Sequence, residues 1–284
     1  MLRPKNNKTK PRIKHRPFLK WAGGKFRLTD DLNRVFPKRK QCLIEPFVGA
    51  GAVFLNSHFE RYILADINPD LINLFNIVKD NVDAYIEACK PIFFAENANT
   101  ADYYYAQRDA FNQSTDPFVR SVLFLYLNRF GFNGLCRYNS KNEFNVPFGA
   151  YKTHYFPEDE LRYFAHKAQS AVFLCADFQQ TFELADKHSV IYCDPPYAPL
   201  PQDTNFTGYA GNAFGLEHQK NLAECAKKAQ KEKQISVVIS NHDTKFTREI
   251  YKGAKFKRVK VQRSISQSSE KRVKVKELIA IFKG

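Results

Sequence analysis

Five short apolar runs constrain the fold of this 284-residue chain more than any other feature. Most are nearly uninterrupted and rich in β-branched residues, a pattern typical of strands buried on both faces of a parallel sheet. Helical patterns at 24–35, 50–56 and 216–231 lie between several of them. Alternation of strand and helix predicts an α/β doubly wound fold. The expected strands are residues 42–47, 62–66, 171–175, 189–194 and 235–240.

Two regions depart from this alternation. Residues 256–264, where valine alternates with lysine, and the apolar run at 276–283 predict a closing β-hairpin with an exposed basic loop. Residues 69–156 contain no clear parallel strand, so we expect a helical insertion there. Its predicted helices are 71–90, 101–111 and 117–130. The chain then divides into a basic flexible arm (1–16), an α/β domain (17–68 and 157–284) and the insertion (69–156).

The positive charge is concentrated at the two ends of the chain. The formal net charge is +15, to which residues 1–20 contribute +8, residues 245–284 contribute +10 and the remainder contributes −3. A polyanionic partner fits this distribution, because Lys and Arg gain by releasing counterions from phosphates. A solvated tail with a basic surface strand fits it equally well, and composition leaves both open.

Cysteine usage and hydropathy indicate the cellular compartment in which the chain works. The six cysteines form no CxxC pair and several lie in apolar runs, which predicts buried, reduced thiols and neither a disulfide framework nor a metal site. No apolar run approaches the ~18 residues of a membrane span. The basic N-terminus lacks the apolar core of a signal peptide. We therefore expect a cytoplasmic protein without a membrane partner.

Two segments at the first predicted strands carry ligand-binding chemistry. In EPFVGAG (45–51), Gly49 and Gly51 let the backbone turn sharply and approach a ligand. The third glycine of the dinucleotide fingerprint is missing, and a tight turn without a ligand fits nearly as well. Asp66 ends the next strand, where ligands of open α/β sheets bind. Its carboxylate suits ribose hydroxyls, or it caps the helix that begins at Asn68-Pro69.

The segment Asp194-Pro195-Pro196-Tyr197 follows the fourth predicted strand. Two prolines hold the chain extended and remove two backbone donors, which leaves the Pro195 carbonyl free. Asp194 and that carbonyl form a two-acceptor site for an amino group, and Tyr197 offers a stacking face for a flat base. An ordinary turn after a strand rarely places Asp and Tyr on either side of Pro-Pro.

The segment FLKWAGGK (18–25) contains Trp21, the only tryptophan, beside a Gly-Gly turn and Lys25. It fits the aromatic and cationic wall of a cofactor site. It fits a chain-entry turn with a packed tryptophan equally well, and the segment alone does not decide between them.

In this order, FLKWAGGK, EPFVGAG, an insertion and DPPY, the chain resembles the α group of S-adenosylmethionine-dependent DNA adenine-N6 methyltransferases. Within that group it is similar to the Dam-type enzymes, which three further segments fit. These are residues 126–139 (YLNRFGFNGLCRYN), 144–149 (FNVPFG) and 240–244 (SNHDT). The resemblance extends from about Arg16 to the C-terminus.

The resemblance implies a Rossmann-like methyltransferase sheet, with the insertion as the DNA target-recognition domain. It implies transfer of a methyl group from S-adenosylmethionine to N6 of adenine in GATC duplex DNA, with no metal. The implied catalytic residues are Asp194, Pro195, Pro196 and Tyr197. The residues implied to bind or shape the cofactor site are Trp21, Lys25, Phe47, Gly49, Gly51, Asp66 and Asp194.

The chemistry expected of these residues follows from the adenine amine. Its lone pair is delocalised into the ring, so it is a weak nucleophile. Hydrogen bonds from its two N–H groups to Asp194 and the Pro195 carbonyl would pull the nitrogen towards tetrahedral geometry, with its lone pair aimed at the methyl group. Positioning and stabilisation of the developing ammonium contribute most. The base cannot be reached inside a duplex, so it must flip out.

Recognition of the sequence is implied for residues of the insertion and for Lys20, which would contact the first guanine. Arg137 suits a bidentate contact with guanine O6 and N7, although it also fits a surface phosphate clamp. Ala150 stands where a common form of the family carries an arginine that grips flanking phosphates. The residues expected to contact DNA are Lys20, Phe132, Asn133, Leu135, Arg137 and Pro147.

Three other functions remain as alternatives: a non-catalytic nucleic-acid-binding protein with the same fold, a methyltransferase acting on RNA or a protein amide, and, least favoured, a nicotinamide dehydrogenase. The intact DPPY segment argues against the first. We expect a monomer that acts at the bacterial nucleoid. Mismatch-repair marking, replication control and a restriction-linked role are all compatible with the chemistry.

Overall fold

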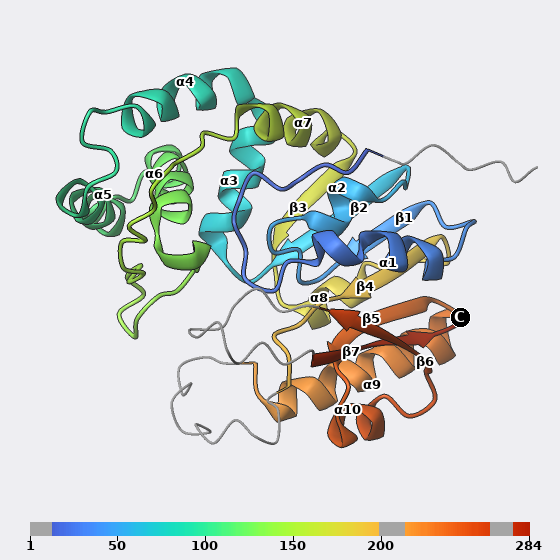
Figure 1. The fold of residues 1–284 in the computed structure, drawn as a ribbon. Helices are drawn as coiled ribbons and strands as arrows, with labels where there is room; N and C mark the ends of the chain where they lie inside the picture. Colours follow the sequence, from blue (N-terminus) through green and yellow to red (C-terminus); the bar gives the residue numbers. More distant parts are fainter. Residues whose placement is uncertain (1–12, 199–213, 262–274) are drawn as a thin grey trace, which may run out of the picture.

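The computed structural model describes residues 13–198, 214–261 and 275–284. Its centre is a seven-stranded sheet with the order β3-β2-β1-β4-β5-β7-β6 (Figure 1). The first five strands run parallel, and β7 pairs antiparallel with both β5 and β6. The strands are β1 (Cys42–Glu45), β2 (Arg61–Asp66), β3 (Ala171–Cys175), β4 (Ser189–Cys193), β5 (Ser236–His242), β6 (Lys255–Val261) and β7 (Val275–Phe282).

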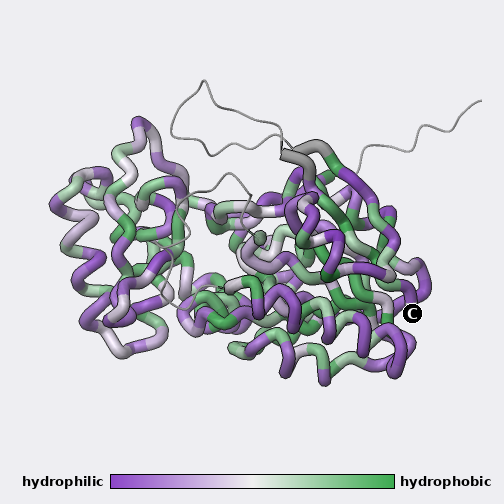
Figure 2. Tube along the Cα trace, turned by 90° about the horizontal axis from the view of Figure 1, so that it is seen from below, coloured by the Kyte–Doolittle hydropathy of each residue, from purple (hydrophilic) through white to green (hydrophobic). Residues whose placement is uncertain are grey.

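Both faces of the central strands are buried, which confirms the inference from continuous apolar runs. In β1, Leu43 joins one hydrophobic cluster while Cys42 and Ile44 join another. Helices cover each face, and Figure 2 shows hydrophilic and hydrophobic segments alternating along many of them. The helices outside the insertion are η1 (Lys25–Leu28), α1 (Thr29–Val35), α2 (Ala52–Asn56), α7 (Glu158–Ala168), α8 (Phe178–Glu183), α9 (Leu216–Lys233) and α10 (Lys245–Ile250).

A helical insertion separates β2 from β3, although these strands are neighbours in the sheet (Figure 1). The expected single helix 71–90 is wrong, because Asn81 leaves the helical region with φ −152° and ψ 78°. Its side chain caps the next helix by accepting from Ala84 N at 3.1 Å. The insertion contains α3 (Pro69–Asp80), α4 (Val82–Phe93), α5 (Ala101–Gln113), α6 (Pro117–Phe130) and η2 (Phe132–Gly134).

Helix α6 forms the buried axis of the insertion. Pro117 occupies its first turn, and Asp116 caps it by accepting from Phe118 N and Val119 N. Nearly every residue from Ser121 to Phe130 is buried. Helix α3 packs against α6 and also against β2 and β3, so it joins the insertion to the sheet.

The closing hairpin is confirmed as the antiparallel pair β6 and β7. Strand β7 lies between β5 and β6 in the sheet, so the second strand of the hairpin is the one that joins it to β5. The predicted basic loop between 264 and 276, except for Val275, and residues 1–12 of the predicted basic arm lie outside the described residues. Among those described, no helix combines the length and apolar character needed to cross a bilayer.

The expectation of buried thiols holds for only part of the set. Cys175 is exposed at the end of β3, which is an edge strand of the described sheet. Cys136 and Cys225 are half-buried, and Cys42, Cys89 and Cys193 are buried.

Candidate active site

The Asp194–Tyr197 segment begins where β4 ends, beside the end of β1. The strand order reverses between these two strands: β2 and β3 lie on one side and β5 on the other. Ligands of open α/β sheets bind at such a switch point, outside the carboxyl ends of the strands. The fold therefore places the Asp-Pro-Pro-Tyr segment at the position where a ligand crevice is expected.

A buried lysine holds the two ends of this segment. Lys25 Nζ lies 2.9 Å from Asp194 Oδ1 and 4.7 Å from the centre of the Tyr197 ring, and it donates to the Gly23 carbonyl at 2.6 Å. The contact with Asp194 has ion-pair distance but not hydrogen-bond direction, so Oδ1 is buried without a hydrogen-bond donor among the described residues. Burial raises the pKa of Asp194, and the charge of Lys25 opposes that rise.

The Pro195 carbonyl is a second open acceptor. Within the part of the chain that the structure describes, no hydrogen bond reaches it, whereas the Pro196 carbonyl accepts from Gln219 Nε2 at 2.6 Å. Tyr197 turns its hydroxyl to Glu277 Oε2 at 3.1 Å and its ring edgewise to His242. The loop therefore presents two acceptors side by side: Asp194 Oδ1, which is paired with the Lys25 ammonium, and the Pro195 oxygen, to which no described residue donates.

Glu45 belongs to this site, and the sequence analysis did not single it out. It is the last residue of β1, it is 2% exposed, and its Oε1 has no partner among the described residues. Burial and the nearby charge of Asp194 raise its pKa well above the usual carboxyl value. The available signal was a carboxylate at the end of an otherwise apolar strand, because such a group is costly to bury.

Asp66 lies at the end of β2 and faces the glycine turn. Its Oδ2 accepts from Gly49 N at 3.2 Å and its Oδ1 accepts from Asn68 N at 3.1 Å. Burial raises the pKa of Asp66, against these hydrogen bonds. The cap of α3 is Asn68, which accepts from Asp70 N and Leu71 N. The structure thus excludes the reading of Asp66 as the helix cap.

Trp21 packs directly on the glycine turn. A Cβ atom at Gly49 would lie 2.8 Å from Trp21 Nε1, and Gly49 has φ +48°, so a side chain is excluded by contact and by conformation. Gly51, at φ +74°, begins α2. Phe47 is half-buried and stacks on Phe178, with ring centres 5.7 Å apart. Trp21, the glycine turn and Asp66 therefore form one continuous wall.

Arg137 lies on the surface of the insertion in a defined position. Its Nε donates to Asn145 Oδ1 at 2.7 Å and its Nη2 donates to the Asn145 carbonyl at 3.0 Å. Pro147 and Phe132, both exposed, are joined by a hydrogen bond from Phe132 N to the Pro147 carbonyl. The segment 131–148 thus folds back on itself and presents Arg137, Pro147 and Phe132 from a single loop.

Lys20 and Asn133 connect this loop to neighbouring segments. Lys20 Nζ donates to the Arg129 carbonyl at 2.6 Å and lies 3.8 Å from the centre of the Tyr151 ring. Burial, aided by the charge of Arg129, lowers the pKa of Lys20 to about 8. Asn133 N donates to the Tyr151 hydroxyl at 2.7 Å. The partner residues Asn145 and Tyr151 were not predicted from the sequence.

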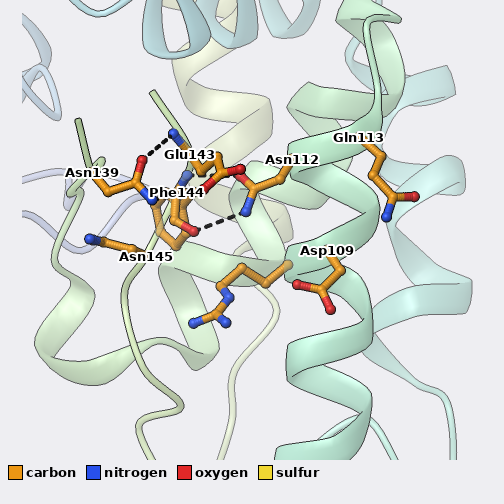
Figure 3. Close-up of a pocket in the computed structure, with 8 residues that line it drawn as sticks. Asp109, Asn112, Gln113, Asn139, Glu143, Phe144 and Asn145 are labelled. Carbon is orange, nitrogen blue, oxygen red and sulfur yellow. Dashed lines mark hydrogen bonds between the residues drawn. The ribbon is translucent and has the colours of Figure 1, made fainter. Parts of the chain in front are cut away.

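A pocket of about 280 Å³ lies beside this loop, against α5 (Figure 3). None of its lining residues belongs to the cluster around Asp194, so it is separate from the switch-point site. Asn112 bridges its wall by hydrogen bonds to both the N–H and the carbonyl of Phe144. The pocket is lined by Arg108, Asp109, Asn112, Gln113, Asn139, Glu143, Phe144 and Asn145.

Among the residues that the structure describes, no group of three or more His, Cys, Asp or Glu side chains is placed to hold a metal ion. The polar groups at this site include the Asp194 and Glu45 carboxylates, the Lys25 ammonium, the Tyr197 ring and the Pro195 carbonyl. These groups suit recognition of a planar nitrogen base and charge stabilisation.

Comparison with known proteins identifies the family of this chain. A family model described as D12 class N6 adenine-specific DNA methyltransferase matches residues 21–265. The chain is 83% identical over 282 residues to a DNA adenine methylase of Haemophilus influenzae, covering 99% of each chain. It is 58% identical over 270 residues to the DNA adenine methylase of Escherichia coli K12, covering 95% of this chain and 96% of the relative. The chain therefore belongs to the D12 class N6 adenine-specific DNA methyltransferases and is a Dam-type member of that class.

Proposed function

We propose that the chain transfers a methyl group from S-adenosylmethionine to N6 of adenine in GATC duplex DNA, after flipping the adenine out of the helix. The observation that carries this proposal is the open acceptor pair of Asp194 Oδ1 and the Pro195 carbonyl at the switch point of the sheet. An exocyclic amine has two N–H groups, and these two acceptors match them.

The wall formed by Trp21, Gly49 and Asp66 fits the proposed methyl donor. Asp66 would hold ribose hydroxyls, since its carboxylate is already oriented by two backbone donors. Gly49 keeps the chain close beneath the Trp21 ring. Phe47 and Gly51 would shape the same cavity. S-adenosylmethionine, when bound, supplies a positively charged sulfur that carries the methyl group to be transferred.

The chain's own residues would orient the adenine and carry its charge. Asp194 and the Pro195 carbonyl would accept from the two N–H groups, and Tyr197 would stack on the ring. Positive charge develops on the nitrogen as it is methylated, and the Asp194 carboxylate would stabilise it. We assign Lys25 the role of keeping Asp194 ionised. Its ion pair favours the charged form of the carboxyl group, which is the form that stabilises the nitrogen.

We propose that residues 69–156 recognise the target sequence. Arg137 supports this role because Asn145 fixes its guanidinium while leaving it exposed. Bidentate pairing with guanine is the specific contact that such a guanidinium makes best. Lys20 would contact the first guanine, Leu135 and Pro147 would contact thymine methyl groups, and Phe132 and Asn133 would lie near the flipped base.

We further propose a monomer that works at the DNA of the nucleoid in the cytoplasm. The support is the DNA substrate of the class and the net charge of +15.

The test is transfer of a labelled methyl group from S-adenosylmethionine to short duplexes. We expect incorporation into a GATC duplex, and little into a GTAC duplex of the same composition or into structured RNA. Equal labelling of both duplexes would contradict GATC specificity and leave the methyl transfer intact. Absence of labelling in every substrate would favour a non-catalytic DNA-binding protein.

A further inference from the structure

The Asp-Pro-Pro-Tyr loop is tied to the protein by a buried group of amides. Gln219, on α9, donates from Nε2 to the Pro196 carbonyl at 2.6 Å. Asn241, near the end of β5, accepts from Ala198 N at 3.1 Å through Oδ1. Both side chains are 0% exposed. The two amides therefore grip the backbone immediately before and immediately after Tyr197.

The two amides are also joined to each other. Asn241 Nδ2 donates to Gln219 Oε1 at 2.9 Å and to the Tyr251 hydroxyl at 3.1 Å, and that hydroxyl lies 3.3 Å from the same Oε1. His242 Nδ1 lies 2.7 Å from the Ala198 carbonyl, so a third side chain meets the same backbone. A buried network with its hydrogen bonds satisfied is rigid, because displacing any member leaves a buried polar group without a hydrogen-bond partner.

This rigidity has a direct consequence for the acceptor pair. Each proline fixes its own φ, and Pro196 also holds ψ of Pro195 extended, so the two prolines form a stiff unit. The ψ torsion of Pro196 stays free, so Pro-Pro alone does not determine how this unit, and with it the Pro195 carbonyl, is oriented in the site. The anchor on the next carbonyl, that of Pro196, supplies the missing constraint. Fixing that carbonyl and the amide of Ala198 restricts the torsions on both sides of Tyr197.

We propose that Gln219 is a positioning residue for methyl transfer: through the Pro196 carbonyl it sets the direction of the Pro195 carbonyl and the Tyr197 ring. This inference rests on the proposed function, in which those two groups orient the adenine. Gln219 touches neither the base nor the methyl donor. Its effect is on the rate of the chemical step and not on DNA affinity, since the groups assigned to reading the sequence are Lys20 and residues of the insertion.

The test replaces the amide of Gln219, which donates to the Pro196 carbonyl, by a group of nearly the same shape. In Gln219→Glu, a protonated carboxyl group still donates to the Pro196 carbonyl and accepts from Asn241. An ionised one repels that carbonyl. The matched control is Gln230→Glu, because Gln230 lies on the same helix and also donates to a backbone carbonyl, that of Lys283 at 2.9 Å. Gln219→Met removes the donor at every pH.

The readout is the single-turnover rate of methyl transfer to a GATC duplex at saturating methyl donor, measured with the KM for DNA across a range of pH. We expect Gln219→Glu to lose about tenfold or more in rate as the pH rises, to recover as it falls, and to keep its KM. Gln219→Met stays slow throughout, while Gln230→Glu follows the native protein. Tyr251 and His242, which face the network, and His218, on the same helix, are present in all four proteins, so their effects cancel in the comparison.

Coincident rate profiles for Gln219→Glu and Gln230→Glu would overturn the proposal, as would a change confined to KM. Circular dichroism at each pH separates a folding defect from a rate defect. If Gln219→Glu does not fold, a Gln219→Met protein with the native rate overturns the proposal and a slow folded one supports it. Failure of the proposed function is distinct, because the native protein would then transfer no methyl group.

Discussion

The ammonium group of Lys25 lies 2.9 Å from Asp194 Oδ1, and only 7% of the lysine side chain is exposed. The pair is therefore shielded from the solvent that weakens ion pairs at a protein surface. Burial raises the pKa of Asp194 and Lys25 lowers it. The lysine thus extends the pH range in which the carboxylate is ionised.

Replacing Lys25 by Met is expected to narrow that range. Without the cation the pKa of Asp194 rises, so activity lost on acidification is lost at a higher pH. The acidic limb of the kcat profile should therefore move to higher pH. Lys25→Arg, which keeps the charge, should shift it less. An unchanged acidic limb in Lys25→Met would contradict the role of the ion pair.

Asp194→Ala is expected to abolish methyl transfer while the fold is kept, because it removes the acceptor that orients and stabilises the reacting nitrogen. Asp194→Asn keeps the size and removes the charge, so it should also be severely impaired. Labelled methyl incorporation measures the loss, and thermal unfolding checks the fold. Native turnover in Asp194→Ala would exclude the proposed role of the carboxylate.

Arg137→Ala should cost roughly 1–3 kcal/mol of discrimination at a single guanine. The measurement compares kcat/KM on GATC with kcat/KM on duplexes substituted at each position. A smaller loss at the same position is expected for Asn145→Ala, since Arg137 remains but is no longer held. A uniform loss of affinity on all duplexes, with preference unchanged, would identify Arg137 as a phosphate clamp.

The lowered pKa of Lys20, about 8, predicts a pH-dependent affinity for DNA. The ammonium group is charged below that pKa and loses its charge as the pH rises through it. Binding of a GATC duplex should therefore weaken between about pH 7 and 9, by about 1 kcal/mol or more for loss of a charge-assisted contact. Lys20→Met should bind weakly at both pH values. Equal pH dependence in Lys20→Met and the native protein would refute the assignment.

Gly49→Ala should weaken binding of the methyl donor. The added Cβ would lie 2.8 Å from Trp21 Nε1, so the indole ring has to move. The positive φ adds a conformational cost of about 1–2 kcal/mol. Gly253→Ala is the control, since Gly253 also has positive φ but no atom within 4 Å of the added carbon. Calorimetry with S-adenosylhomocysteine should show reduced affinity for Gly49→Ala alone.

The sheet was predictable because each central strand is a continuous run of apolar residues, and such a run indicates burial without reference to the rest of the chain. The runs expected at 171–175 and 189–194 correspond to β3 and β4. Helix boundaries were harder. The apolar pattern continues across Asn81, and only the capping hydrogen bond to Ala84 N shows that the chain turns there. Helix α7 was not predicted, although its buried residues Leu161, Phe164, Ala165 and Ala168 have helical spacing and its first turn is acidic, and both features indicate a helix.

The candidate site was predictable where one short segment carries the chemistry, as in Asp194–Tyr197. Partners supplied by distant segments were not. Asn145 holds Arg137 from across a loop, and Gln219 reaches the Pro196 carbonyl from α9. A glutamine on an amphipathic helix has no local sign that it is buried. Its role depends on which backbone the fold brings to it.

The neighbouring strands β2 and β3 are separated in the chain by residues 67–170. Closing so long a segment costs entropy unless it has already become compact. We therefore expect the insertion to collapse around α6 before the edge strand docks. Damage to that buried helix would then slow maturation of the whole enzyme, and lower its yield in the cell, even where every catalytic side chain is intact.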